Sequence, residues 1–137
     1  DIYGPIDEQQ IDWFEELQKT FPDYVKYKGM VQFDKSVEVL KDYFFLAFPT
    51  RFYTEGIPGT ILDAYAAGVP VLASKWESFN DVVDDGSTGI GYEFADYKDL
   101  KQKIEHIYEI INLKKTCINK AEDYLPHVAI KVLLDEL

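Results

Sequence analysis

The sequence is poor in cysteine and in basic residues, and it contains no long hydrophobic run. Cys117 is the single cysteine, which excludes an internal disulfide framework and favours a reducing compartment. The longest unbroken apolar run, 43–49, is far too short to span a bilayer, and no basic segment followed by an apolar one marks a secretory signal. Together these features predict a cytoplasmic protein.

Lysine and arginine are outnumbered by acidic residues, 14 against 25, so the formal net charge is −11. The acidic residues are scattered through the chain and leave no basic stripe, which argues against a nucleic-acid partner. The average electrostatic field of the chain is negative, so it would not attract a nucleotide diphosphate either. Local dipoles and a few cations would have to hold such a ligand.

Length and composition predict one globular domain, since 137 residues with 47% apolar content can bury a core. Short apolar runs alternate with helical patterns, which predicts βα units wound onto a parallel sheet. The expected strands cover 1–4, 24–28, 43–48, 69–74 and 90–94. The run 43–48 lacks alternation and is therefore expected to be buried on both faces.

Helices are expected between these strands. Ile11, Phe14, Leu17 and Phe21 share one face, a short helix covers 34–42, and a helical turn covers 80–83. Pro58 begins another helix, which stops at Gly68. Leu100, Ile104, Ile107 and Ile111 predict one long helix, and the remainder is expected to be helical with a break at Pro126.

The stretch 50–71 carries the chemistry. A strand delivers the chain to a loop where the Pro58 helix begins, and open α/β sheets bind ligands at such points. The first-turn amides of that helix have no internal partner, so with the helix dipole they suit a phosphate. Gly56 and Gly59 allow close approach of a ligand to the backbone.

Two carboxylates flank the start of this helix. Glu55 lies just before it and Asp63 one to two turns into it, where both could accept hydrogen bonds from hydroxyls at either end of a bound pyrophosphate. Arg51 is the nearest cation. Plainer interpretations stay open: Glu55 as a solvated loop carboxylate, Asp63 as an exposed helix residue, and Arg51 in a surface ion pair with Glu55.

The sequence Glu-Gly-Ile-Pro-Gly-Thr-Ile-Leu-Asp-Ala at 55–64 resembles the donor-site motif of the retaining GT-B glycosyltransferases of family four, the glycosyl transferases group 1. That motif has two glutamates separated by seven residues, so Asp63 departs from it by one methylene. The resemblance extends to the segments 66–74, 85–89 and 27–31. It implies the C-terminal, Rossmann-like α/β domain of a GT-B fold, a parallel sheet flanked by helices, which binds the nucleotide-sugar donor.

The resemblance also implies roles for individual residues. Glu55, the candidate catalytic residue, would contact the donor sugar, and Asp63 the ribose. The remaining donor-binding candidates are Arg51, Gly56, Ile57, Pro58, Gly59 and Thr60 around the phosphates, and Gly29, Met30 and Val31 near the base. No metal and no cofactor are expected, since helix dipoles and cations would carry the charge of the leaving nucleotide diphosphate.

By the same resemblance, the strand and helix that supply basic residues to the pyrophosphate, and the acceptor-binding N-terminal domain, are absent before Asp1. The chain is therefore expected to be a fragment that is inactive alone. The expected reaction is retaining hexosyl transfer from a UDP- or GDP-hexose to a saccharide or lipid-linked acceptor, in surface-polysaccharide synthesis. Membrane contact, at the inner face, would be peripheral and made through the missing parts.

Two alternatives stay open at this point. Another GT-B enzyme, such as a sugar-nucleotide epimerase or a phosphorylase, would share the fold, although the Glu55 to Asp63 spacing argues against it. A non-catalytic nucleotide-sugar-binding subunit would keep the fold without turnover, and the aspartate at position 63 is compatible with this. No motif of the sequence specifies the base, the sugar, the acceptor or the linkage.

Overall fold

The computed structural model describes residues 1–109 and 111–135, and the chain divides into two compact units, Asp1–Ser36 and Val37–Leu137. The single-domain organisation stays a prediction. Within the described ranges, every helix is too short or too polar to traverse a bilayer.

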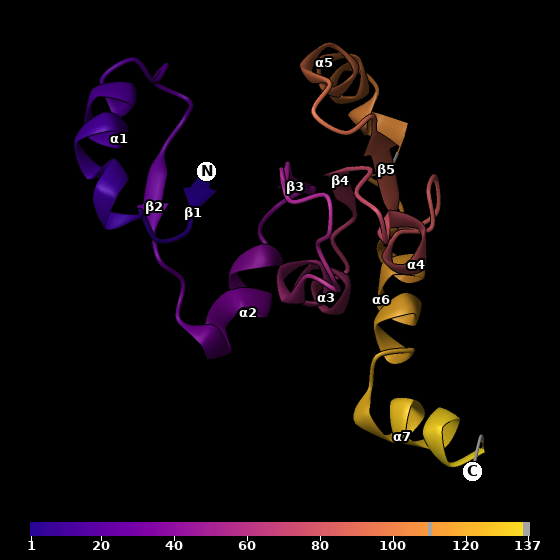
Figure 1. Ribbon diagram of the computed structural model, residues 1–137. Coiled ribbons are helices and arrows are strands. Elements are labelled where there is room, and N and C mark those ends of the chain that lie inside the picture. The colour runs from indigo at the N-terminus through magenta and orange to yellow at the C-terminus, as the bar shows by residue number, and fades with distance from the viewer. Residues whose placement is uncertain (110, 136–137) are drawn as a thin grey trace. The chain divides into compact units, whose positions relative to one another are not determined.

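The N-terminal unit is a βαβ arrangement (Figure 1). Its elements are β1 (Ile2–Tyr3), η1 (Glu8–Gln10), α1 (Ile11–Gln18), β2 (Tyr27–Gly29) and η2 (Phe33–Lys35). The two strands pair in parallel, and Phe14 of α1 packs edge-on against Tyr27 of β2, with ring centroids 4.9 Å apart. The second strand begins later than the expected Tyr24, because the amide of Val25 donates to the carbonyl of Pro22 in a turn (2.9 Å).

The C-terminal unit is built on a three-stranded parallel sheet in the order β3-β4-β5. Its elements are α2 (Ser36–Leu40), β3 (Leu46–Phe48), α3 (Gly59–Ala67), β4 (Val71–Ser74), α4 (Phe79–Val82), β5 (Gly89–Tyr92), α5 (Tyr97–Glu105), η3 (Ile107–Glu109), α6 (Lys114–Glu122) and α7 (Pro126–Asp135). Helices follow each strand, so the predicted Rossmann-like α/β class is confirmed.

The central strand β4 is buried along its whole length, because helices cover both faces of the sheet there. On one face, Val71 and Ala73 join a core with residues from α3, α4 and α6. On the other face, Leu72 packs with Ile90 and Tyr92 of β5, and Leu100 of α5 lies against them. The largest fully buried side chains include Tyr65, Tyr92, Phe79, Ile61 and Leu72.

The expectation that the run 43–48 is a strand buried on both faces is wrong. Only Leu46–Phe48 is extended, Ala47 is exposed, and the side chain of Phe44 is 79% exposed. The physical reason is the position of α5. This helix packs against β5, at the edge of the sheet opposite β3, and does not extend over Ala47. Burial on both faces belongs instead to the central strand.

The single long helix expected from Leu100 to Ile111 is also interrupted. The helix α5 ends at Glu105, because His106 leaves helical geometry with φ −103° and ψ 11°, and a short 3-10 helix follows at Ile107–Glu109. Leu100 and Ile107 nevertheless pack against the same cluster of β4 and β5 residues. Ile104, which the apolar pattern placed on the same face, is 47% exposed. The pattern thus identified two of the packed residues but neither the exposure of Ile104 nor the break in the backbone.

The limits of α3 follow the local signals in the sequence. Pro58 is the N-cap residue, and Gly68 ends the helix in the left-handed conformation with φ 74°. Its amide donates to the Tyr65 carbonyl at 2.9 Å, which satisfies one of the final carbonyls of the helix. The predicted break near the C-terminus is confirmed as well, since α6 ends at Glu122 and α7 begins at Pro126.

Candidate functional site

The predicted donor site of the C-terminal unit lies in the loop between β3 and α3 (Figure 1), at the carboxyl edge of the parallel sheet. Glu55 is half-buried in this loop, and its Oε2 accepts a hydrogen bond from the Thr50 hydroxyl at 3.3 Å. The main chain turns tightly here, since the Glu55 amide donates a long hydrogen bond of 3.4 Å to the Phe52 carbonyl. The carboxylate is therefore held beside the start of α3.

The first turn of α3 has the properties of an anion site. The amides of Ile61 and Leu62 both donate to the Pro58 carbonyl, at 3.0 and 3.3 Å. Among the described residues, no acceptor engages the amides of Gly59 and Thr60, and neither a capping side chain nor an acidic residue of the first turn neutralises the dipole. Free amides and an uncompensated helix dipole favour a bound phosphate.

Space is open where a side chain would begin at Gly56, in the loop, and at Gly59, the first residue of α3. A Cβ atom added to Gly56 or Gly59 would meet no atom within 4 Å, and neither residue has a positive φ. Neither backbone conformation nor packing within the described structure thus requires glycine at these positions. The remaining physical reason for glycine at these two positions is room for a ligand next to the backbone.

The other predicted residues around α3 lie in different environments. Asp63 is half-buried in the second turn of α3, and Arg51 is exposed in the preceding loop. In the part of the chain that the structure describes, Arg51 and Glu55 form no ion pair. Pro58 is buried, whereas Ile57 and Thr60 are exposed at the start of the helix.

Hydrogen bonds from the end of β4 and from the segment after it hold the loop that carries Glu55 in place. The Ser74 hydroxyl donates to the Thr50 carbonyl at 2.8 Å, and the Glu77 amide donates to the Tyr53 carbonyl at 2.9 Å. Sequence reasoning assigned no role to Thr50 or Ser74. The signal that could have found them is positional, since each ends or follows an apolar strand at the same edge of one parallel sheet.

Gly29, Met30 and Val31, the predicted base-binding residues, belong to the N-terminal unit. Gly29 adopts φ 75°, and its carbonyl accepts a hydrogen bond of 3.0 Å from the amide of Gly4. The ends of β1 and β2 are therefore joined directly. Met30 is exposed and Val31 is half-buried at this edge of the two-stranded sheet.

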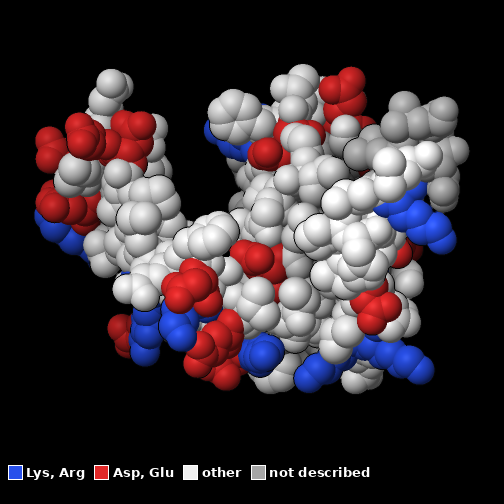
Figure 2. Space-filling model, turned by 90° about the horizontal axis from the view of Figure 1, so that it is seen from below, with Lys and Arg blue, Asp and Glu red and all other residues white. Residues whose placement is uncertain are grey.

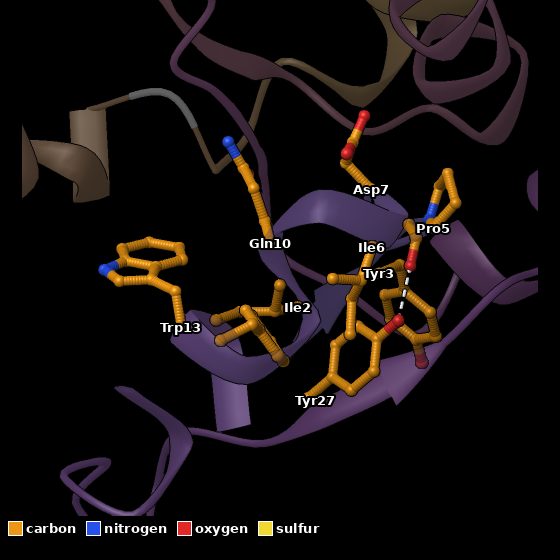
Figure 3. Close-up of a pocket in the computed structure, with 10 residues that line it drawn as sticks. Ile2, Tyr3, Pro5, Ile6, Asp7, Gln10, Trp13 and Tyr27 are labelled. Carbon is orange, nitrogen blue, oxygen red and sulfur yellow. Dashed lines mark hydrogen bonds between the residues drawn. The ribbon is translucent and has the colours of Figure 1, made fainter. Parts of the chain in front are cut away.

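A pocket that the sequence did not predict lies beside these strand ends (Figure 3). Its volume is about 130 Å³. The Tyr27 hydroxyl donates to the Gly4 carbonyl at 2.7 Å and closes one side. The lining residues are Ile2, Tyr3, Gly4, Pro5, Ile6, Asp7, Gln10, Trp13, Phe14 and Tyr27. Aromatic and aliphatic side chains thus form most of the lining, together with the polar side chains of Asp7 and Gln10.

The charge distribution agrees with the composition. Figure 2 shows acidic side chains on both units, with a cluster on the N-terminal unit, whose helix α1 carries Asp12, Glu15 and Glu16. Near the Glu55 loop, burial raises the pKa of Tyr92, and a hydrogen bond with the Ser74 side chain partly opposes this rise. The Tyr92 hydroxyl therefore stays neutral at physiological pH and acts as a hydrogen-bonding group.

The sequence is similar to those of known glycosyltransferases. A family model described as glycosyl transferases group 1 matches residues 1–109. Two uncharacterized glycosyltransferases of Methanocaldococcus jannaschii are each 26% identical to the chain, over 74% and 81% of its length. The chain spans less than a third of these relatives, 28% and 29% of their lengths.

Solved structures share the fold. A sucrose-phosphate synthase from Thermosynechococcus elongatus aligns over 98% of this chain and 36% of its own, with a TM-score of 0.76 and 18% identity. The structure of TarM aligns over 98% of this chain and 27% of its own, with a TM-score of 0.67 and 18% identity. At this identity the likeness concerns the GT-B type of fold alone.

Proposed function

The chain belongs to the glycosyl transferases group 1, and we propose that it binds the nucleotide-sugar donor of a retaining glycosyltransferase. The observation that carries this proposal is the first turn of α3. It combines unengaged amides at Gly59 and Thr60, open space beside Gly56 and Gly59, and the Glu55 carboxylate immediately upstream. A diphosphate flanked by hydroxyl-bearing groups fits that combination.

In the proposed complex, the pyrophosphate lies at the N-terminus of α3, where the free amides and the helix dipole stabilise its negative charge. Glu55 accepts hydrogen bonds from hydroxyls of the donor sugar. Asp63, further along the helix, accepts from the ribose. Arg51 is exposed and can add a positive charge near the phosphates.

During transfer, the bond between the anomeric carbon and the diphosphate oxygen breaks, and its electron pair leaves with the nucleotide diphosphate. The acceptor hydroxyl oxygen bonds to the same carbon with retention of configuration, and its proton passes to the departing diphosphate. The contribution of this chain is positional and electrostatic, because it orients the sugar and stabilises the leaving group. The proposed donor is a UDP- or GDP-hexose, and the acceptor a saccharide or lipid-linked saccharide of a surface polysaccharide.

Calorimetric titration of the full-length protein with UDP, GDP and their hexose conjugates tests this proposal. We expect the nucleotides of one base to bind selectively. Glu55→Gln should weaken binding of the sugar conjugate, and Asp63→Asn should weaken binding of every nucleotide that carries this base. Glu105→Gln, an exposed carboxylate at the end of α5, is the matched control and should change nothing. Absence of any nucleotide binding would overturn the proposal.

Turnover separates the enzyme from its alternatives. We expect the full-length protein to release nucleoside diphosphate from the bound donor in the presence of an acceptor, and Glu55→Gln to abolish this release. Donor binding without release would instead support a non-catalytic subunit. Interconversion of the sugar without any transfer would support an epimerase.

A further inference from the structure

Two side chains outside the predicted donor site act on it through the loop between β3 and α3. We infer that Thr50 positions the Glu55 carboxylate toward the donor sugar, and that Ser74 holds Thr50 in place. The inference rests on the proposed function, since it concerns the same site. Thr50 and Ser74 are positioning residues, because they reach the sugar only through Glu55.

The Thr50 hydroxyl makes two hydrogen bonds with complementary directions. It accepts from the Phe52 amide at 3.1 Å and donates to Oε2 of Glu55 at 3.3 Å. Because the amide must donate, the hydroxyl proton is left for the carboxylate. Among the described residues, no other side chain bonds to Glu55, so this contact selects its rotamer and leaves Oε1 for a ligand hydroxyl.

The main chain of Thr50 is fixed by a buried group. The Ser74 side chain is completely buried at the end of β4, and its hydroxyl donates to the Thr50 carbonyl at 2.8 Å. Ser74 is paired in register with Tyr92 of β5, which is also buried. A buried polar group without partners would be costly, so this arrangement is strongly specified.

Packing after β4 reinforces the same loop. Trp76 is buried and packs edge-on against Phe48, the last residue of β3, with ring centroids 6.0 Å apart. One residue later, the Glu77 amide donates to the Tyr53 carbonyl at 2.9 Å. The loop is thus held at Thr50 and at Tyr53, on both sides of the Phe52 amide that orients the hydroxyl. Glu55 is preorganised rather than free to sample many rotamers.

The experiment compares binding of a nucleotide-sugar with binding of its nucleoside diphosphate by the full-length protein. Thr50→Val removes the hydroxyl and keeps the side-chain shape. We expect about tenfold weaker binding of the sugar conjugate, since one hydrogen bond to a charged group is lost. Binding of the diphosphate should be unchanged, because Glu55 does not contact it. Thr50→Ser should retain wild-type affinity.

A double-substitution cycle separates positioning from a structural role. In a Glu55→Ala background, Thr50→Val should cause no further loss, because its effect passes through the missing carboxylate. Ser74→Ala should weaken sugar-conjugate binding to a smaller extent. Thr116→Val, which removes hydroxyl bonds to the Ser87 and Leu113 carbonyls, is the matched control and should leave both ligands unaffected.

Thermal unfolding of each variant establishes that it is folded, and Thr50→Ala replaces Thr50→Val in every comparison if the valine variant does not fold. Unchanged binding in Thr50→Val, equal weakening of both ligands, or independent effects of Thr50→Val and Glu55→Ala would each overturn the inference. If the unsubstituted protein binds neither ligand, the proposed function fails first and takes the inference with it. Donor binding that depends on Glu55 but not on Thr50 would overturn the inference alone.

Discussion

The hydroxyl groups of Tyr65 and Thr88 lie 3.1 Å apart in the core of the C-terminal unit. Tyr65 donates its proton to the Val82 carbonyl at 3.1 Å, so the Thr88 hydroxyl donates to Tyr65. Thr88 in turn accepts from the Asp84 amide at 3.0 Å. A continuous chain of hydrogen bonds thereby connects α3 with the end of α4 and the turn before β5. Since α3 carries the predicted phosphate site, this chain helps to fix the helix on which the site depends.

Tyr65→Phe should destabilise the protein by about 1–3 kcal/mol, because the buried Val82 carbonyl and the Thr88 hydroxyl each lose a partner. Urea unfolding followed by circular dichroism measures this loss. Tyr124→Phe removes a peripheral bond of 3.3 Å to the Asp81 carbonyl and serves as the control, with an expected loss below about 0.5 kcal/mol. Equal losses in the two variants would contradict the importance of the buried chain.

Stability should fall in alkaline solution, between about pH 9 and about pH 11, because of Cys117. Burial raises the pKa of its thiol to about 11. From about pH 9 to about pH 11 the unfolded chain therefore loses a proton that the folded chain retains, which favours unfolding as the pH rises. Cys117→Ala should flatten this decline, measured as the free energy of unfolding against pH. The same slope in both proteins would show that Cys117 is not responsible.

Gly59→Ala should separate ligand binding from folding. Its Cβ would enter open space, so we expect stability to be unchanged or higher by about 0.4–1 kcal/mol. Nucleotide binding should nevertheless weaken by about tenfold or more, because the methyl group occupies the proposed phosphate approach. In Gly91→Ala the Cβ would lie 2.6 Å from Cζ of Phe79, so this control should lose stability, by about 1–3 kcal/mol. Wild-type nucleotide affinity in Gly59→Ala would argue against the proposed approach.

Asp63→Glu should tighten nucleotide binding, because it restores the one methylene by which the motif differs from the family pattern. A direct hydrogen bond replacing a weaker or water-mediated contact is worth about 1 kcal/mol, or roughly a fivefold change in the dissociation constant. Calorimetry with the nucleoside diphosphate measures this change. Weaker binding in Asp63→Glu would show that the pocket is shaped for aspartate.

Much of the fold was readable from local signals. The limits of α3 follow from Pro58 and Gly68, since proline suits a helix start and glycine tolerates the left-handed cap. The order of strands and helices followed from alternating apolar patterns. The burial of the 43–48 run and the continuity of the helix after Leu100 were wrong. Both depend on which elements lie above a given residue, and periodicity carries no information about that.

For the candidate site, the sequence by itself determined which residues share the loop and the first turns of α3, because they are neighbours along the chain. Only the tertiary structure decided that Ser74 and Glu77 hold the loop through hydrogen bonds, each to a loop residue 24 positions earlier in the chain. It also decided that Thr50 engages Glu55 and that the space beside Gly59 is open. The physical reason is that hydrogen bonds between strand ends depend on the register of the parallel sheet, which is set by packing of the whole core rather than by any local pattern.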